Sequence, residues 1–137
     1  MIVIDTNIII SALIKDSATR KIIVESALQF AYPEPSLQEI IKYKSYILEK
    51  SGYSKSTFDS ILNKLLEYIN LIPLSIIGPK LNRAKKEMES IDVKDAIFLA
   101  LALALDNAAI WSDDTDFEKQ KSVRVLKTRD MVKMFEK

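Results

Sequence analysis

The chain has 137 residues, enough for one domain with a real hydrophobic core, and we expect a single domain over residues 1–137. Only two glycines and four prolines are present, which excludes long flexible linkers. The formal net charge of +1 excludes a strong overall field toward nucleic acid or membrane, but not a local basic patch. The absence of Cys and His excludes disulfides, thiolate nucleophiles and a Ser-His-Asp triad.

The predicted elements alternate between short apolar strands and helices. Strands are expected at Ile2–Ile4 and at residues 30–32, 71–74, 108–111 and 123–126. Helices are expected at residues 8–13, 19–28, 36–48, 58–69, 81–88 and 92–106, with a last one from Arg129. Pro33 is expected to stop the second strand, and Pro73 to place the third at an edge. The alternation predicts an α/β fold with three layers, α/β/α, around a central, mostly parallel sheet of four to five strands.

No segment resembles a membrane span. The longest apolar run covers residues 96–105, far short of the roughly 20 residues that a bilayer requires. The N-terminus has neither the basic start nor the small-residue cleavage site of a signal peptide. We therefore expect a cytoplasmic protein that does not contact a membrane.

Acidic residues follow several of the predicted strands. Asp5 comes directly after the first strand, and Asp113, Asp114 and Asp116 come after the strand at 108–111. Glu39 and Asp95 each fall in the first turn of a helix. In a parallel sheet, strand ends and the starts of the following helices share one edge, which is where ligands bind. The sequence therefore predicts an acidic site at that edge.

Several of these polar residues also have a structural interpretation. Ser36 and Glu39 have the spacing of a capping box. Asp92 is expected to cap the long helix, where Asp95 would favour the positive end of its dipole. Asn7 could cap a helix from Ile8, with residues 5–7 forming a turn, and residues 113–116 could be an acidic turn. Asp5 is the hardest to explain structurally, because both flanks are core-like and an unpaired buried carboxylate is costly.

Carboxylates that crowd together repel one another unless a cation neutralises them. Oxygen ligands without His or Cys suit Mg²⁺ or Mn²⁺, and Mg²⁺ usually also meets a phosphate. A hard cation held by acids polarises a phosphoryl oxygen. Only Gly52 and Gly78 are present, so no phosphate-binding glycine loop competes with this interpretation. The acids thus favour phosphate-ester hydrolysis.

Four stretches together resemble the PIN domain, a family of small metal-dependent ribonucleases. They are IDTNIII at the start, SLQEI around Glu39, DVKDAIFLALALA and WSDDTDF. The last resembles the family's Thr-x-Asp-x-Asp-Phe, with Ser112 in place of Thr. A domain of this length is most similar to the VapC toxins of toxin–antitoxin pairs. That resemblance implies an Mg²⁺- or Mn²⁺-dependent endoribonuclease that forms a homodimer and is inhibited by a small antitoxin.

The resemblance also assigns roles to residues. It implies a catalytic quartet of Asp5, Glu39, Asp95 and Asp114. Asp5, Asp95 and Asp114, with Asp116, would hold one or two metal ions, and Glu39 would ligate or orient the attacking water. Thr6, Asn7 and Ser112 would support the site.

RNA contacts are predicted more weakly. The basic residues that follow the presumed site segments are Lys15, Arg20, Lys42, Lys44 and Lys119. Each of them could equally be an ordinary solvated side chain. Tyr43 or Trp111 could stack on a base, although Trp111, on a buried strand, is expected in the core.

Three alternatives stay open. A haloacid dehalogenase-like phosphatase has Asp after its first strand but needs a second Asp two residues later, where this chain has Asn7. A response-regulator receiver needs acids before or around the first strand, and none precedes Ile2. A catalytically silent module could bind RNA or protein, although it would not need to keep every acid.

Overall fold

The computed structural model describes residues 1–90 and 92–136. Within these residues, five parallel strands form one sheet in the order β3-β2-β1-β4-β5. The strands are β1 (Ile2–Ile4), β2 (Phe30–Pro33), β3 (Ile69–Ile72), β4 (Ala109–Trp111) and β5 (Val125–Leu126). This confirms the predicted three-layer α/β/α fold with its parallel sheet.

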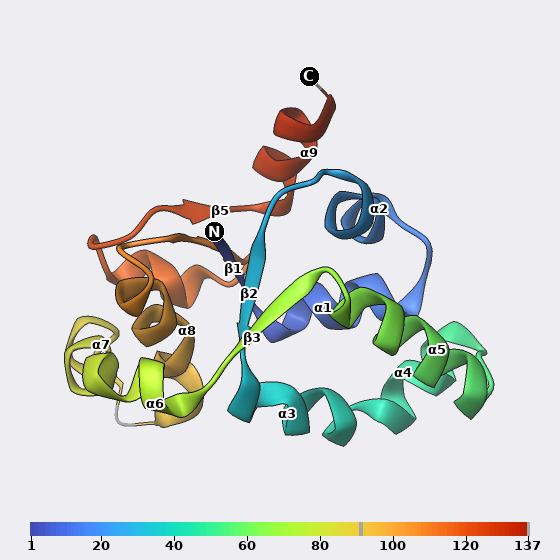
Figure 1. The fold of residues 1–137 in the computed structure, drawn as a ribbon, viewed down its shortest axis with the longest axis horizontal. Helices are drawn as coiled ribbons and strands as arrows, with labels where there is room; N and C mark the ends of the chain where they lie inside the picture. The colour runs from blue at the N-terminus through green and yellow to red at the C-terminus, as the bar shows by residue number, and fades with distance from the viewer. Residues whose placement is uncertain (91, 137) are drawn as a thin grey trace.

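Helices cover both faces of the sheet (Figure 1). One layer contains α1 (Thr6–Ile14), α2 (Ala18–Glu25) and α5 (Lys55–Leu66). The other contains α6 (Leu74–Ile77), α7 (Leu81–Glu87) and α8 (Val93–Ala104). The remaining helices are α3 (Leu37–Lys42), α4 (Lys44–Ser51) and α9 (Thr128–Glu136), with 3-10 turns η1 (Glu34–Ser36), η2 (Gly78–Lys80) and η3 (Thr115–Lys119).

The long helix α8 is buried against one face of the sheet, as predicted for a buried helix. It packs against β1, β2 and β4, and every residue from Ala96 to Leu103 is buried. Asp92 caps it, because its Oδ1 accepts a hydrogen bond of 2.9 Å from the Lys94 amide. None of the helices in the described residues combines the length and apolar character that crossing a bilayer requires.

Several predicted boundaries are wrong. The expected helix at 36–48 is two helices that meet at Tyr43, and the bend lets Ile40 and Ile47 each reach the core. The helix expected to reach Ile69 ends at Leu66, because Ile69 pairs with Phe30 in the sheet. The strand β2 ends at Pro33, as expected, but includes that residue. At that position β2 is paired with β3 and no longer with β1. The missing amide hydrogen of Pro33 therefore costs no hydrogen bond to β1.

Candidate functional site

The order of the strands sets the position of the site. From β1 the chain adds β2 and then β3 on one side, and afterwards returns to add β4 and β5 on the other. The order therefore reverses between β1 and β4, whose carboxyl ends lie next to each other. Ligands of open α/β sheets bind in the crevice at such a point. Asp5 follows β1 and Ser112 follows β4, so both belong to this crevice.

Asp5 joins β1 to α1 and is only 7% exposed. Helix α1 begins at Thr6 rather than Ile8, so Asp5 occupies the position before the helix and Asn7 lies within its first turn. The predicted turn over residues 5–7 and the capping role of Asn7 are therefore wrong. Asp5 forms no side-chain capping hydrogen bond. Its carboxylate is therefore not used to cap α1.

Ser112 connects the two strand ends. It is fully buried, and its hydroxyl donates a hydrogen bond of 2.7 Å to Oδ2 of Asp5. The same hydroxyl oxygen accepts a hydrogen bond of 3.0 Å from the Asp114 amide. Ser112 therefore fixes the Asp5 carboxylate and, at the same time, the backbone that carries Asp114.

The pKa of the Asp5 carboxyl is raised, chiefly because burial disfavours its charged form. The hydrogen bond from Ser112 lowers this pKa, whereas the negative charge of Asp114 raises it. The backbone amides of Asn7 and Thr6 lower it further. A cation bound between Asp5 and Asp114 would offset both the burial and the repulsion.

A buried chain of hydroxyl groups holds the segments of Asp5 and Glu39 together. The hydroxyls of Thr6 and Tyr32 lie 2.7 Å apart, and the Tyr32 hydroxyl donates to the Ser36 carbonyl at 2.9 Å. Since Tyr32 gives its proton to Ser36, Thr6 is the donor in the first bond. Burial raises the pKa of Tyr32, so its hydroxyl keeps this proton. Thr6 thus supports the site by fixing the start of α1 to η1.

Glu39 is not part of a capping box. Ser36 precedes α3, but its side chain makes no capping hydrogen bond. The capping interpretation of Glu39 is therefore wrong, which leaves its carboxylate free to face the crevice. On α8, Asp95 accepts a hydrogen bond of 3.1 Å from the Ser90 hydroxyl.

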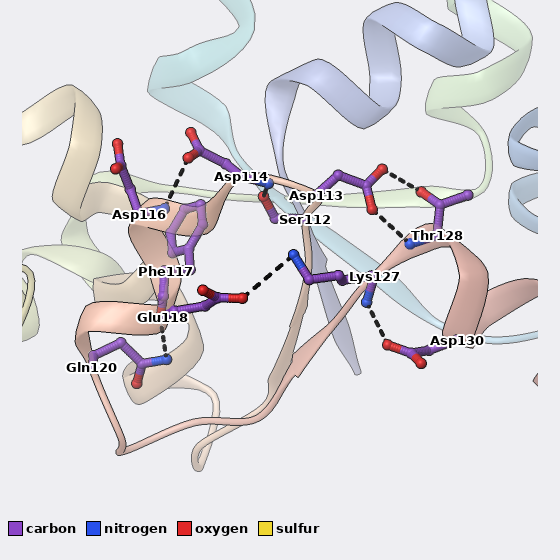
Figure 2. A network of polar contacts seen from close by, with 10 residues as sticks. All are labelled: Ser112, Asp113, Asp114, Asp116, Phe117, Glu118, Gln120, Lys127, Thr128 and Asp130. Carbon is purple, nitrogen blue, oxygen red and sulfur yellow. Dashed lines mark hydrogen bonds and ion pairs between the residues drawn. The ribbon is translucent and has the colours of Figure 1, made fainter.

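The three aspartates after β4 have different surroundings (Figure 2). Asp113 points toward α9 and accepts two hydrogen bonds from Thr128, from its amide at 2.8 Å and its hydroxyl at 2.7 Å. Asp114 and Asp116 point to the other side of the loop, and Asp114 accepts the Asp116 amide at 2.9 Å. Asp113 therefore fixes the start of α9, while the other two face the crevice.

The crevice is an open cleft of about 260 Å³, which we call the acidic cleft. It brings together the proposed acids from four parts of the chain, with two of the supporting residues. The residues that line it are Asp5, Thr6, Asn7, Glu39, Lys42, Tyr43, Met88, Asp92, Lys94, Asp95, Phe98, Asp114, Asp116 and Phe117. The sequence interpretation missed Lys94, although its place directly before Asp95 could have suggested it.

Of the predicted basic contacts, only Lys42 lines the acidic cleft. Arg20 donates from Nε to the Ala12 carbonyl at 2.7 Å, so it holds the end of α1. Lys44 forms an ion pair of 3.3 Å with Asp59. Lys15 and Lys119 are exposed and line none of the cleft. Tyr43 lines the cleft and is 44% exposed, whereas Trp111 is fully buried in the core, as expected.

The donor set fits a hard divalent cation. The side chains that could hold it offer carboxylate oxygens, which Mg²⁺ and Mn²⁺ prefer, and a cation would offset the burial of a charged Asp5. As the side chains stand in residues 1–90 and 92–136, no three acidic groups are close enough to hold one ion. Binding an ion would therefore require changes of side-chain rotamer among acids that already share one cleft.

Comparisons with known proteins agree with this architecture. The family model described as PIN domain matches residues 3–135. A solved structure, described as a toxin–antitoxin complex from Klebsiella pneumoniae, is similar in fold with a TM-score of 0.66. It is 20% identical, and the match covers 93% of this chain and 98% of that one. A search of curated proteins found no match.

Proposed function

Because the chain belongs to the PIN domain family, we propose that it is a metal-dependent endoribonuclease that hydrolyses phosphodiester bonds in RNA. The observation that carries the proposal is the acidic cleft at the reversal point of the sheet. Asp5, Glu39, Asp95, Asp114 and Asp116 all line it, although they come from four separate segments. No disulfide or His-based chemistry competes, because the chain has neither Cys nor His.

We assign Asp5, Asp95 and Asp114, with Asp116, to holding one or two Mg²⁺ or Mn²⁺ ions. When bound, such an ion neutralises charge that builds on the phosphate during the reaction. Ser112 orients the Asp5 carboxylate through its hydrogen bond of 2.7 Å. Glu39, which makes no capping bond, orients the attacking water and accepts its proton. The water oxygen forms the new bond to phosphorus, the bond to the leaving sugar oxygen breaks, and that oxygen takes up a proton from solvent.

We further propose that the protein is a VapC-like toxin that acts in the cytoplasm as a homodimer and is inhibited by a small antitoxin. The similar fold in a toxin–antitoxin complex supports this assignment. Co-expression with the product of a small neighbouring reading frame tests it. A stable complex that loses RNA cleavage is expected, and light scattering of the isolated chain measures its oligomeric state.

The direct test of the activity uses the purified full chain. Labelled single-stranded RNA, single-stranded DNA and p-nitrophenyl phosphate are incubated with Mg²⁺, with Mn²⁺ and with EDTA. We expect cleavage of RNA with either ion and none with EDTA. Cleavage that persists in EDTA would contradict the metal-dependent mechanism. A preference for the small phosphoester would favour a phosphatase, and metal binding without cleavage of any RNA would favour a silent binding module.

A further inference from the structure

A second cavity adjoins the acidic cleft, and we call it the side cavity. Its volume is about 410 Å³, within the range of small-ligand sites. Pro35, Val93 and Ile97 give it apolar walls, contributed by η1 and the first turns of α8. It shares Glu39, Lys42 and Lys94 with the acidic cleft. A ligand that extends from one cavity into the other must therefore pass these three side chains.

We propose that the side cavity binds one nucleobase of the RNA strand that is cleaved in the acidic cleft, and that Lys42 and Lys94 hold the phosphate between them. This inference rests on the proposed function, since it names the part of the RNA that lies beside the scissile bond. The occupant is a single-stranded nucleotide, because a base inside a duplex could not enter a cavity beside the cleft.

Charge supports this path for the strand. Six carboxylates line the acidic cleft, and the RNA backbone carries a negative charge at each phosphate. Lys42 and Lys94 are the cations among the lining residues, and both are exposed. In the described part of the chain, neither ammonium group forms an ion pair or a hydrogen bond, unlike Lys44 with Asp59 and Lys127 with Glu118. They are therefore free to neutralise a phosphate on the side where the two cavities meet.

The walls of the side cavity suit a flat apolar surface. Val93 is 40% exposed at the first position of α8, although it is aliphatic. Ile97, which is 4% exposed, lies one turn further along α8, and Pro35 of η1 also lines the cavity. A base that contacts these side chains would bury apolar surface, which stabilises binding.

Gln38 adds a polar group to the side cavity. Its Nε2 donates a hydrogen bond of 3.1 Å to the Pro35 carbonyl. A carbonyl only accepts, so this bond fixes the amide and leaves Oε1 as an acceptor for the ligand. An acceptor favours the bases that have an amino group, which are adenine, cytosine and guanine, over uracil, whose pairing edge has carbonyl oxygens on both sides of its N–H.

The test measures binding separately from cleavage. Fluorescence anisotropy gives the Kd of the full chain for a single-stranded RNA oligonucleotide in EDTA, which removes the ion that the proposed cleavage requires. We expect Lys42→Ala and Lys94→Ala each to weaken binding by about threefold to tenfold. Each should also reduce the slope of log Kd against the logarithm of the salt concentration by about 0.7. Lys133→Ala, an exposed lysine on α9 that lines neither cavity, is the matched control and should change neither quantity.

Two further variants test the base itself. Val93→Asp makes one wall charged but suits the start of a helix, so the protein should fold and bind about tenfold more weakly. Ile76→Asp changes an exposed aliphatic residue outside both cavities and is the control. Gln38→Met should remove a preference, of about fivefold, for oligo(A) and oligo(C) over oligo(U).

The outcomes separate the two proposals. If the wild type cleaves RNA but Lys42→Ala, Lys94→Ala and Val93→Asp keep its Kd, the side cavity does not hold the strand and this inference is wrong. If the wild type binds the oligonucleotide with the expected sensitivities but cleaves no RNA, the side cavity is confirmed and the proposed nuclease activity fails. Equal binding of all oligonucleotides by wild type and Gln38→Met would overturn the base preference.

Discussion

Ser112 donates a hydrogen bond of 2.7 Å to Asp5, although 107 positions separate the two residues. The bond crosses from the end of β4 to the end of β1, where the order of the strands reverses. It places a buried carboxylate at the base of the acidic cleft and fixes its orientation. The neighbouring bond to the Asp114 amide, at 3.0 Å, makes Ser112 the common support of two proposed metal ligands.

Ser112→Ala should weaken metal binding and RNA cleavage by about 10- to 100-fold, because partners that orient a metal ligand typically have effects of that size. Removing the hydroxyl also removes the interaction that lowers the pKa of Asp5, so metal affinity should become more sensitive to acid. Titration with Mn²⁺ at several pH values measures both effects. Ser112→Thr keeps the hydroxyl and should restore binding. If Ser112→Ala binds Mn²⁺ as the wild type does, Ser112 has no orienting role.

Asp5→Asn should stabilise the metal-free protein at neutral pH. Folding raises the pKa of Asp5, so its contribution to stability is present below the unfolded value of 3.8 and is lost as the pH rises through the folded value. Because the folded pKa is raised, ionisation of Asp5 opposes folding as the pH rises, and the variant lacks this cost. Urea unfolding should show a higher free energy of unfolding for the variant at pH 7, and a shrinking difference toward pH 3.8. Asp16→Asn, at an exposed site, is the control and should show no such trend.

Mn²⁺ should reverse that ranking of stability. An ion that binds only the folded state raises the melting temperature in proportion to the logarithm of its concentration. The wild type should gain several degrees at saturating Mn²⁺, whereas Asp5→Asn should gain almost nothing. Calorimetry with and without Mn²⁺ measures this. Equal gains for the two proteins would show that the ion binds somewhere other than Asp5.

Tyr32→Phe should lower the free energy of unfolding by about 1–2 kcal/mol, because it leaves the buried Thr6 hydroxyl and Ser36 carbonyl without their partner. The ring keeps its packing against Phe98, at 5.9 Å between centroids. RNA cleavage should fall through kcat, since the segments of Asp5 and Glu39 lose their connection. Tyr43→Phe, at an exposed tyrosine, is the control for stability. An unchanged free energy of unfolding in Tyr32→Phe would contradict a structural role for the hydroxyl chain.

Much of this arrangement could be predicted from local sequence. The strand at Ile2–Ile4, the buried helix after Asp92 and the strand that ends at Trp111 have strong apolar patterns, and their neighbouring acids follow directly. The parallel fold then brings those acids to one edge. The first residue of α1 was not predictable in this way, because Thr6 is held by Tyr32 from another strand.

Long-range contacts also separate residues that look alike in the sequence. Asp113 and Asp114 are adjacent acids after the same strand, and in the sequence only the motif resemblance distinguishes them. In the structure, Thr128 holds the Asp113 carboxylate at the start of α9, whereas Asp114 caps η3 through the Asp116 amide and lines the acidic cleft. Ile69 continues the helical spacing of the apolar residues in α5, but it lies in strand β3 because it pairs with Phe30. Lys42 and Lys94 are far apart in the sequence, and only the fold places both of them beside the same two cavities.

The pair Asp113 and Asp114 provides the most direct test of the proposed active site. The initial rate of cleavage of single-stranded RNA in Mn²⁺ is measured for Asp113→Asn and Asp114→Asn, which change the same charge on neighbouring residues. Asp114→Asn should lose about 100-fold or more, since removing a metal ligand forfeits several kcal/mol of transition-state stabilisation. Asp113→Asn should cleave within about twofold of the wild type, because its carboxylate only holds the start of α9. Equal losses in both variants, or full activity in Asp114→Asn, would contradict the assignment of the acidic cleft as the site of RNA hydrolysis.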